Sequence, residues 1–163
     1  MEIKTEVAVT IKVNGRQVTA TVYPEESLLD FLRGRVGATE VKCGCNKGDC
    51  GTCTVILAGQ AVKSCLVLAA QADNKEVWTL KGLAEDALMQ ELQESFATHG
   101  AVQCGFCTPG MLIAARKFLE QHPNPDRLAI KEALAGNLCR CTGYKKIVDA
   151  VAAVAAGRAS TRS

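Results

Sequence analysis

The sequence predicts an α+β fold in which a β-rich half is followed by an all-helical half. Up to about residue 80, short runs of alternating apolar and polar residues are typical of strands with one buried face. From Lys81 and Gly82 onward, apolar residues repeat instead at the spacing of a helix. We therefore expect a β-rich domain over residues 1–80 and a helical domain over residues 81–163, with no long linker between them.

Short apolar runs divide the β-rich half into its expected elements. The Asn14-Gly15 pair separates two alternating runs, which is a strong signal for a tight β-hairpin. One short helix is expected over residues 26–35, where Ser27 can act as the N-cap, and Gly59 marks a later turn. The strand signals and one further apolar stretch cover residues 7–13, 18–22, 54–59, 60–69 and 76–80.

Four helices are expected in the second half. Leu88, Leu92 and Phe96 repeat at i, i+4 and i+8, so they share one face of a helix that Gly100 can end. Threonine and proline mark the starts of later helices, because threonine suits the N-cap and proline the first helical position. These helices are expected over residues 109–121, from Asn124-Pro125 to Gly136-Asn137, and over residues 143–156, with N-caps at Thr108 and Thr142. The tail, residues 157–163, is expected to be frayed.

The charge and the N-terminus argue against several classes of function. A formal net charge of +2, with lysines and arginines scattered along the chain, supports no nucleic-acid partner and no basic membrane-binding surface. The N-terminus lacks the apolar core of a signal peptide, and no apolar run is long enough for a membrane span. We therefore expect a cytoplasmic protein. In that reducing compartment, nine cysteines indicate metal ligands rather than disulfides.

The first group of cysteines lies in the segment CGCNKGDCGTC, residues 43–53. Cys45, Cys50 and Cys53 have the spacing C-x4-C-x2-C, and Cys65 follows after eleven further residues. This is the plant-type spacing for a [2Fe–2S] cluster, whose last ligand comes from further along the chain. Because three thiolates must converge on one small anion, glycines are needed where the backbone turns tightly and points N–H groups at sulfur. The glycines of the loop are Gly44, Gly48 and Gly51.

Two questions stay open for this segment. Zinc also takes four thiolates, but its usual signature is two short, well-separated cysteine pairs, so an iron–sulfur cluster is the preferred interpretation. Cys43 falls outside the pattern. It is interpreted as a small buried residue that flanks the loop, with an exchangeable fifth ligand as the less favoured alternative.

The second group consists of a C-x2-C pair, Cys104 and Cys107, and a C-x-C pair, Cys139 and Cys141. Both pairs precede predicted helix starts, where free N–H groups and the helix dipole favour an anion. Residues i and i+2 cannot share a helix face, so Cys139 and Cys141 are expected in a turn from which both reach inward. Two facing helical hairpins would then bring the four sulfurs together. A second [2Fe–2S] cluster is the leading hypothesis, and structural zinc is the runner-up.

Three segments together carry a resemblance to a known family: KCGCNKGDCGTCTV, QCGFCTPGM and GNLCRCTGY. In this order they resemble the small iron–sulfur subunits of the molybdenum hydroxylases, the group of xanthine dehydrogenase, aldehyde oxidoreductase and carbon monoxide dehydrogenase. The resemblance covers about residues 7–155. It implies a plant-ferredoxin-like β-grasp domain followed by a four-helix bundle domain. It also implies electron transfer between a large molybdopterin-binding subunit and a medium FAD-binding subunit, in a dimer of heterotrimers.

The resemblance also implies a set of site residues. It assigns one [2Fe–2S] cluster to each domain, with the helical-domain cluster beside the pterin and the other cluster toward the flavin. Gln103 and Cys139 would lie nearest the molybdopterin cofactor, although Gln103 could instead be a polar residue that fills a turn. The implied ligands are Cys45, Cys50, Cys53 and Cys65 in the first domain, and Cys104, Cys107, Cys139 and Cys141 in the second.

The sequence departs from the family pattern in two places. Thr52 replaces the more common alanine, and the NKGD segment lacks the histidine associated with carbon monoxide dehydrogenases. No catalytic residue is expected in this chain, since His99 and His122 have no catalytic partner, and Tyr144 and Trp78 are interpreted as packing residues. A chain that ends after the helical part is expected to be a separate subunit. The alternatives are a free-standing double-cluster ferredoxin, for which a strongly acidic surface would be expected, and a zinc-stabilised interaction module.

Overall fold

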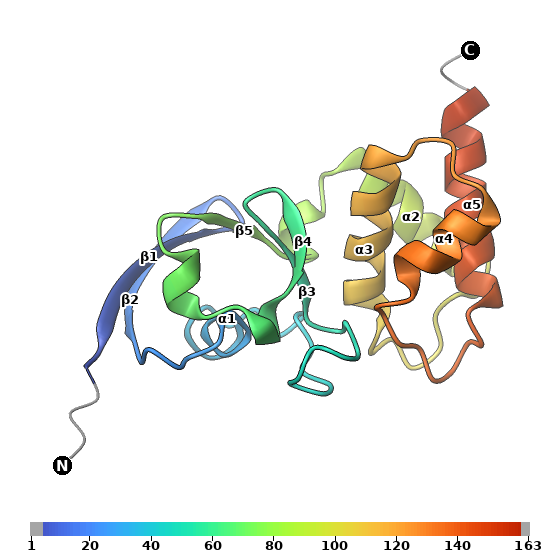
Figure 1. Ribbon diagram of the computed structural model, residues 1–163. Coiled ribbons are helices and arrows are strands. Elements are labelled where there is room, and N and C mark those ends of the chain that lie inside the picture. The colour runs from blue at the N-terminus through green and yellow to red at the C-terminus, as the bar shows by residue number, and fades with distance from the viewer. Residues whose placement is uncertain (1–4, 161–163) are drawn as a thin grey trace.

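The computed structural model describes residues 5–160, and its β-rich and helical parts lie side by side (Figure 1). The N-terminal part is built on a mixed five-stranded sheet with the strand order β2-β1-β5-β3-β4. β1 and β5 are parallel, and the other neighbouring strands are antiparallel. The strands are β1 (Val7–Val13), β2 (Arg16–Val22), β3 (Thr54–Leu57), β4 (Gln60–Lys63) and β5 (Glu76–Trp78). A sheet followed by helices confirms the predicted α+β class.

The Asn14-Gly15 turn joins β1 to β2 as predicted. Asn14 has a φ of 50° and Gly15 a φ of 81°, and a type I′ hairpin turn requires positive φ at both central residues. Val13 pairs with Arg16 directly across the turn, so β2 begins at Arg16 rather than at residue 18. The hairpin therefore has the shortest possible connection, and this connection fixes which side chains of β1 face the core.

The segment 28–35 covers one face of this sheet. Ser27 caps it as predicted, because its hydroxyl accepts a hydrogen bond from the Asp30 N–H at 3.0 Å. Only Leu28–Asp30 (α1) is α-helical, and Phe31–Arg35 continues as a π-helical turn. The apolar side chains of the segment are buried in the same core as the inward-facing residues of β1; they are Leu28, Leu29, Phe31 and Leu32.

The apolar stretch 60–69 is a strand only at its start. β4 ends at Lys63, and a 3₁₀ turn covers Ser64–Leu66. A second 3₁₀ turn covers Ala69–Ala72 before β5 begins. Cys65 consequently lies on a turn that follows the β3–β4 hairpin, and its side chain is not fixed by the alternation of a strand.

The C-terminal part contains, within the described residues, four helices around a second apolar core. α5 contacts α2 and α4, and α3 also contacts α2 and α4, so the helices form the predicted bundle. The helices are α2 (Ala87–Thr98), α3 (Thr108–Gln121), α4 (Arg127–Leu134) and α5 (Lys145–Ser160). None of the helices found in residues 5–160 combines the length and apolar character that a membrane crossing demands.

The starts of α3 and α4 differ in detail from those predicted. Thr108 is the first residue of α3 and not its N-cap; Cys107 is the N-cap, without a side-chain hydrogen bond. α4 is capped by Asp126, whose carboxylate accepts the Ala129 N–H at 2.8 Å, rather than by the preceding Asn-Pro pair. In both cases the predicted signal lies close to the helix start, and the residue that provides the cap is its neighbour.

α5 is longer and begins later than predicted. It begins at Lys145, and the Thr142 hydroxyl accepts the Tyr144 N–H at 3.3 Å in the loop before it. Thr142 therefore shapes the loop and does not cap the helix. The helix continues to Ser160, so the first part of the predicted frayed tail is helical. Residues 161–163 lie outside the described residues.

The two cores meet where α3 packs against β3 and β4. A Cβ atom built on Gly110 of α3 would collide with the Gly51 carbonyl oxygen and would lie 3.1 Å from the Thr52 Cα. Ile56 of β3 is buried in the helical core rather than in the core of the sheet. A glycine in the first turn of α3 therefore lets this helix come into direct contact with the loop that carries the first cysteines.

Gly110→Ala is expected to destabilise the fold by about 1–3 kcal/mol, because the added methyl group overpacks α3 against backbone atoms. Gly157→Ala is the matched control, since nothing lies within 4 Å of a Cβ at this exposed position of α5. There, alanine is expected to stabilise the helix by roughly 0.5–1 kcal/mol. Urea unfolding followed by circular dichroism measures both changes. Effects of the same sign and size at the two glycines would contradict the close approach.

Candidate metal centres

The first group of cysteines lies on two neighbouring loops of the sheet. Cys45, Cys50 and Cys53 lie between the π-helical turn and β3, and Cys65 lies in the turn after β4. Ser64 holds the two loops together, because its N–H and its hydroxyl donate to the Cys53 carbonyl at 3.3 and 2.8 Å. The β3–β4 hairpin thus brings Cys65 next to Cys53, although they are distant in the sequence.

The glycines of the cysteine loop serve two different purposes. Gly48 and Gly51 have φ values of 89° and 69°, so both turns need a residue without Cβ, as predicted. Gly44 does not have a positive φ. A Cβ at Gly44 would lie 2.8 Å from the Cys50 sulfur, so this glycine makes room for the thiol. The need for glycine at Gly44 therefore comes from close packing and not from a positive φ.

Backbone N–H groups point at the Cys45 sulfur. The N–H groups of Lys47 and Cys50 donate to it, with nitrogen–sulfur distances of 3.5 and 3.3 Å. These hydrogen bonds favour the thiolate and lower the pKa of Cys45 from its ordinary 9.0 to about 6. The predicted role of the loop backbone, which is to offset negative charge on sulfur, is therefore visible at this residue.

Cys65 has the opposite character. Burial raises the pKa of the Cys65 thiol to about 11, and a hydrogen bond with Cys53 and the charge of Cys53 add to the effect. A second pair forms where the Cys50 thiol hydrogen-bonds to Cys45. The four thiols are thus arranged as two pairs, and Cys45 is near enough to influence Cys65 electrostatically.

Cys43 and Thr52 differ from expectation. The Cys43 side chain is exposed, so its interpretation as a small buried residue is wrong. The chain buries Val41 and then turns outward into the loop. Thr52 is buried, and its hydroxyl lies 3.3 Å from the Cys50 sulfur, a contact that an alanine could not make. Thr52 is therefore more than a small residue standing in for alanine.

The second group of cysteines lies on two loops at one end of the helical bundle (Figure 1). Cys104 and Cys107 lie just before α3, and Cys139 and Cys141 lie between α4 and α5. The sulfurs of Cys104 and Cys141 are 3.5 Å apart, and Cys107 is hydrogen-bonded to Cys139. Each pair takes one thiol from each loop, so the two loops face each other as the predicted arrangement requires.

The two pairs of the second group differ in their exposure. Burial, followed by the hydrogen bond and charge of Cys139, raises the pKa of the Cys107 thiol to about 12. Burial also acts to raise the pKa of Cys139, but hydrogen bonds from Thr142 and from the Cys141 N–H outweigh it, so this pKa is lowered. Cys104 and Cys141 are exposed, whereas Cys139 is buried. One pair therefore lies inside the loops, and the other lies at the surface.

Two polar residues that follow the C-x-C pair support Cys139, and the sequence did not identify either as a site residue. The Thr142 hydroxyl lies 3.1 Å from the Cys139 sulfur, and the Thr142 N–H donates to this sulfur at 3.4 Å. The Tyr144 hydroxyl accepts the Cys139 N–H at 2.8 Å, so Tyr144 does more than pack. The only signal for these roles in the sequence is their position directly after the cysteines.

The paired thiols fit a two-iron cluster in each group. A [2Fe–2S] cluster with four cysteine ligands takes two thiolates at each iron, so it needs two pairs of thiols. Both groups provide two pairs, and both provide N–H donors to sulfur. Within residues 5–160, no three Cys, His, Asp or Glu side chains gather closely enough to hold one metal ion.

Comparison with known proteins agrees with this chemistry. Residues 11–84 match the family "2Fe-2S iron-sulfur cluster binding domain", and residues 79–152 match the family "[2Fe-2S] binding domain". The chain is 49% identical to the nicotine 6-hydroxylase small subunit of Paenarthrobacter nicotinovorans, over 89% of this chain and 87% of that protein. It is 47% identical to the nicotinate dehydrogenase small FeS subunit of Eubacterium barkeri, over 90% and 93% of the two chains. The chain belongs to the iron–sulfur subunits of the molybdenum hydroxylase family.

A solved structure supports the same relationship at the level of the fold. Quinoline 2-oxidoreductase from Pseudomonas putida 86 aligns with this iron–sulfur subunit with a TM-score of 0.87 and 43% identity. The alignment covers 95% of this chain and 97% of the matched chain. Both the sheet and the helical bundle are therefore shared with an enzyme of this family.

The two cysteine-bearing regions of the iron–sulfur subunit touch. The Leu138 N–H donates to the Cys50 carbonyl at 2.8 Å, which joins the loop before β3 to the loop after α4. Gln103 is exposed on the loop before α3, next to the exposed Cys104. The surface near these loops also carries exposed large apolar side chains, namely Val102, Phe106 and Leu138.

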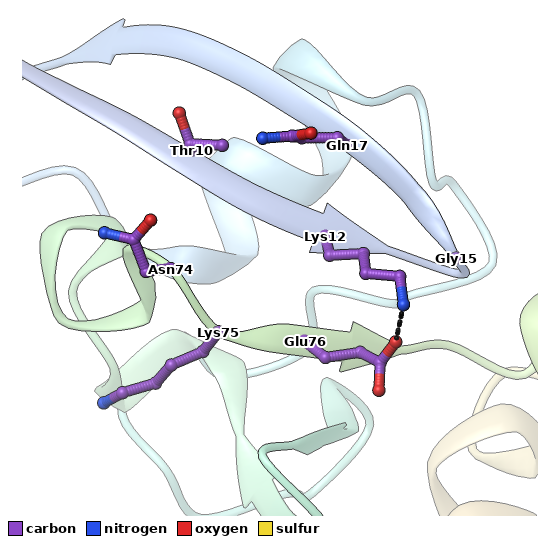
Figure 2. A pocket seen from close by; sticks show the side chains of 7 residues that line it. All are labelled: Thr10, Lys12, Gly15, Gln17, Asn74, Lys75 and Glu76. Atoms are coloured by element: carbon purple, nitrogen blue, oxygen red, sulfur yellow. Dashed lines mark ion pairs between the residues drawn. The ribbon is translucent and has the colours of Figure 1, made fainter.

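Other polar features of the chain lie outside the cysteine groups. A pocket of about 430 Å³ lies on the sheet. Lys12 and Glu76, on the paired strands β1 and β5, line it and form an ion pair at 2.8 Å, which Figure 2 marks with a dashed line. His99 and His122 follow the last turns of α2 and α3 as C-caps. The residues that line the pocket include no cysteine; they are Thr10, Lys12, Gly15, Gln17, Asn74, Lys75 and Glu76.

In the metal-free chain, Cys45 is expected to react with iodoacetamide well before Cys65 and Cys107 as the pH is raised. The thiolate is the reactive form, and the Cys45 thiolate forms above about pH 6, whereas the pKa values of Cys65 and Cys107 are about 11 and 12. Timed labelling at a series of pH values, read by peptide mass spectrometry, measures the three rates. Labelling of Cys107 as fast as that of Cys45 near neutral pH would contradict the assigned environments.

Proposed function

We propose that this iron–sulfur subunit holds two [2Fe–2S] clusters and passes single electrons between a molybdopterin-binding subunit and an FAD-binding subunit. One observation carries the proposal: two groups of four thiols, each arranged as two pairs, lie on loops that touch. Substrate oxidation would take place on the molybdopterin-binding partner. The expected complex is a heterotrimer, with a dimer of heterotrimers as its larger form.

The residues of this chain would hold and tune the clusters. Each bound cluster supplies a centre that accepts and releases one electron at a time. The chain contributes thiolates, N–H donors to sulfur at Cys45 and Cys139, and a buried environment around the inner thiols. The proposed ligands are Cys45, Cys50, Cys53 and Cys65 for the first cluster, and Cys104, Cys107, Cys139 and Cys141 for the second.

The exposed side of the second group is the proposed contact with the molybdopterin-binding subunit. Cys104 is exposed there, and Gln103 and Cys139 are the residues we assign nearest the pterin. Clustered exposed apolar side chains are typical of protein–protein interaction sites. Three such side chains lie on or beside these loops, namely Val102, Phe106 and Leu138, which are 41, 45 and 50% exposed.

The turn that carries Cys65 is the proposed contact with the FAD-binding subunit. Leu66 and Leu68 follow Cys65 and are 62 and 40% exposed. A Cβ at Gly48 would meet Leu66 at 2.5 Å, so Leu66 lies directly over the cysteine loop. An apolar cover of this kind would exclude water from the first cluster once a partner binds on it.

The relatives support a class of substrate for the complex. Their names refer to nicotine, nicotinate and quinoline, which all contain a ring nitrogen in an aromatic heterocycle. We therefore propose that the molybdopterin-binding partner of this subunit oxidises a nitrogen heteroaromatic compound. The iron–sulfur subunit would receive the electrons from that reaction, and its own residues would not select the substrate.

The alternative functions have less support. A free-standing ferredoxin would meet its partners transiently, and the near-neutral charge and exposed apolar side chains favour a lasting contact. A zinc module would need four thiols around one ion, whereas the thiols of each group are arranged as two pairs.

Cys50→Ser and Cys107→Ser are each expected to abolish one of two distinct EPR signals of the reduced complex, because each removes a ligand of a different cluster. Cys43→Ser is the matched control, since Cys43 is an exposed cysteine beside the loop and lies outside both groups. This variant is expected to keep both signals. EPR spectra of the dithionite-reduced complexes measure the outcome. Loss of both signals from a single ligand substitution, or of neither, would overturn the two-site assignment.

Anaerobic addition of substrate is expected to bleach the iron–sulfur absorbance of the natively purified complex. At least one nitrogen heteroaromatic compound among nicotinate, quinoline and purines is expected to bleach it, whereas aldehydes and carbon monoxide are expected to leave it unchanged. Visible absorbance before and after each addition measures the effect, and dithionite gives the fully reduced reference. Bleaching by aldehydes alone would overturn the substrate class and leave the electron-transfer role intact. A colourless preparation that contains zinc would overturn both.

A further inference from the structure

We infer that Asn137 is a positioning residue that sets the rate of electron transfer between the two clusters by clamping their loops together. The inference rests on the proposed function, because it requires both clusters. Asn137 lies two residues before Cys139 and is only 6% exposed. Its backbone N–H donates to the Leu134 carbonyl at 2.9 Å, which ties it to the last turn of α4. Its side chain reaches into the other half of the molecule.

The side chain of Asn137 makes its contacts with the sheet domain. Its amide nitrogen donates to the Gly51 carbonyl at 2.9 Å and lies 3.3 Å from the Thr54 hydroxyl oxygen. The Thr54 hydroxyl donates to the same Gly51 carbonyl at 2.6 Å. These groups are buried, so breaking one of the bonds leaves a polar atom without water to replace its partner. The network therefore holds the loop of the first cysteines against the segment that leads to Cys139.

Beside the Asn137 contacts lies a short path of bonded atoms between the two groups of cysteines. The Leu138 N–H donates to the Cys50 carbonyl at 2.8 Å, directly beside the clamp. A single hydrogen bond therefore separates Cys50, a proposed ligand of the first cluster, from the residue that is covalently bonded to Cys139, a proposed ligand of the second. Electronic coupling decays less along bonded and hydrogen-bonded atoms than across a gap, so this contact favours transfer. One electron leaves one site and arrives at the other, and no bond breaks and no proton moves.

Two glycines make the contact possible. A Cβ at Gly51 would collide with the Gly136 carbonyl and would lie 2.7 Å from the amide nitrogen of Asn137. A Cβ at Gly110 of α3 would collide with the Gly51 carbonyl from another side. The Gly51 peptide is thus enclosed by both loops and by α3, and its carbonyl oxygen is satisfied by the Asn137 and Thr54 side chains. The side-chain amide of Asn137 supplies an N–H donor to this enclosed carbonyl oxygen.

Asn137→Ala in the intact complex is the test, with Asn14→Gly as its matched control. Asn14 also makes two side-chain hydrogen bonds between distant parts of the chain, both to Thr79, at 2.9 and 2.8 Å, and it lies outside the cysteine groups. Glycine tolerates the positive φ at that position. Both variants therefore lose a pair of buried or half-buried contacts, but only Asn137→Ala loosens the route between the groups.

Three readouts are expected to change in Asn137→Ala and to stay unchanged in Asn14→Gly. The magnetic interaction between the two reduced clusters in EPR is expected to weaken while both signals persist. Stopped-flow reduction of the first cluster by substrate is expected to slow, and reduction of the second cluster is expected to keep its rate. Hydrogen exchange of the Leu138 amide is expected to speed up about tenfold, the change expected from one lost hydrogen bond.

Thr54→Val keeps the test decisive if Asn137→Ala does not assemble. Valine retains the shape of threonine and removes one acceptor of the Asn137 amide, so a weaker change of the same readouts is expected. Unchanged cluster interaction and unchanged Leu138 exchange in either variant would overturn the inference. Loss of a cluster signal in Thr54→Val would also overturn it, because the network would then be needed for assembly. Absence of a second signal in the unmodified complex would instead overturn the proposed function.

Discussion

The need to hold four sulfur atoms close together on each pair of loops is the constraint on which the rest of this structure depends. In each group one thiol has hydrogen-bond donors and one is governed by burial. The pKa of Cys45 is lowered to about 6 and that of Cys139 is also lowered, whereas burial raises those of Cys65 and Cys107 to about 11 and 12. The protein backbone alone therefore stabilises only part of the negative charge that four thiolates would carry. A cationic metal centre fits this imbalance, because it would stabilise the thiolates of Cys65 and Cys107, at which burial outweighs the hydrogen bonds that favour the charged form.

Each of the two groups of cysteines is anchored by its own apolar core. The sheet and α1 enclose one core, and the four-helix bundle encloses the other. Neither core contains the cysteine loops as a whole; each core instead fixes the ends of its loops. The loops can therefore be rich in glycine and in N–H donors, since their shape depends on these anchored ends and on sulfur contacts. The contact between α3 and β3 then fixes the distance between the two sets of loops.

The sequence predicted the parts of this structure that depend on local signals. The Asn14-Gly15 hairpin, the Ser27 cap and the helical repeat through Leu88 are local, and the structure confirms them. The predicted burial of Cys43 was wrong, because the pattern of cysteines says nothing about the direction in which a loop turns. The contact of Asn137 with Gly51 joins residues that are 86 positions apart, and no spacing in the sequence indicates it. Local signals therefore identify the thiols, whereas tertiary packing decides their supporting residues.

The distribution of burial gives the proposed electron route a direction. Cys104 and Cys141 form the exposed pair of the second group, whereas Cys139 is 9% exposed and is joined through Leu138 to the first group. A partner that docks over these loops would exchange electrons with the second group, and Cys139, which we also assign nearest the pterin, links that group to the first. The link to the first group runs through backbone atoms, so substitutions of surface side chains leave it intact. The route between the groups therefore uses the main chain of Leu138, whereas the Leu138 side chain, which is 50% exposed, belongs to the proposed partner surface.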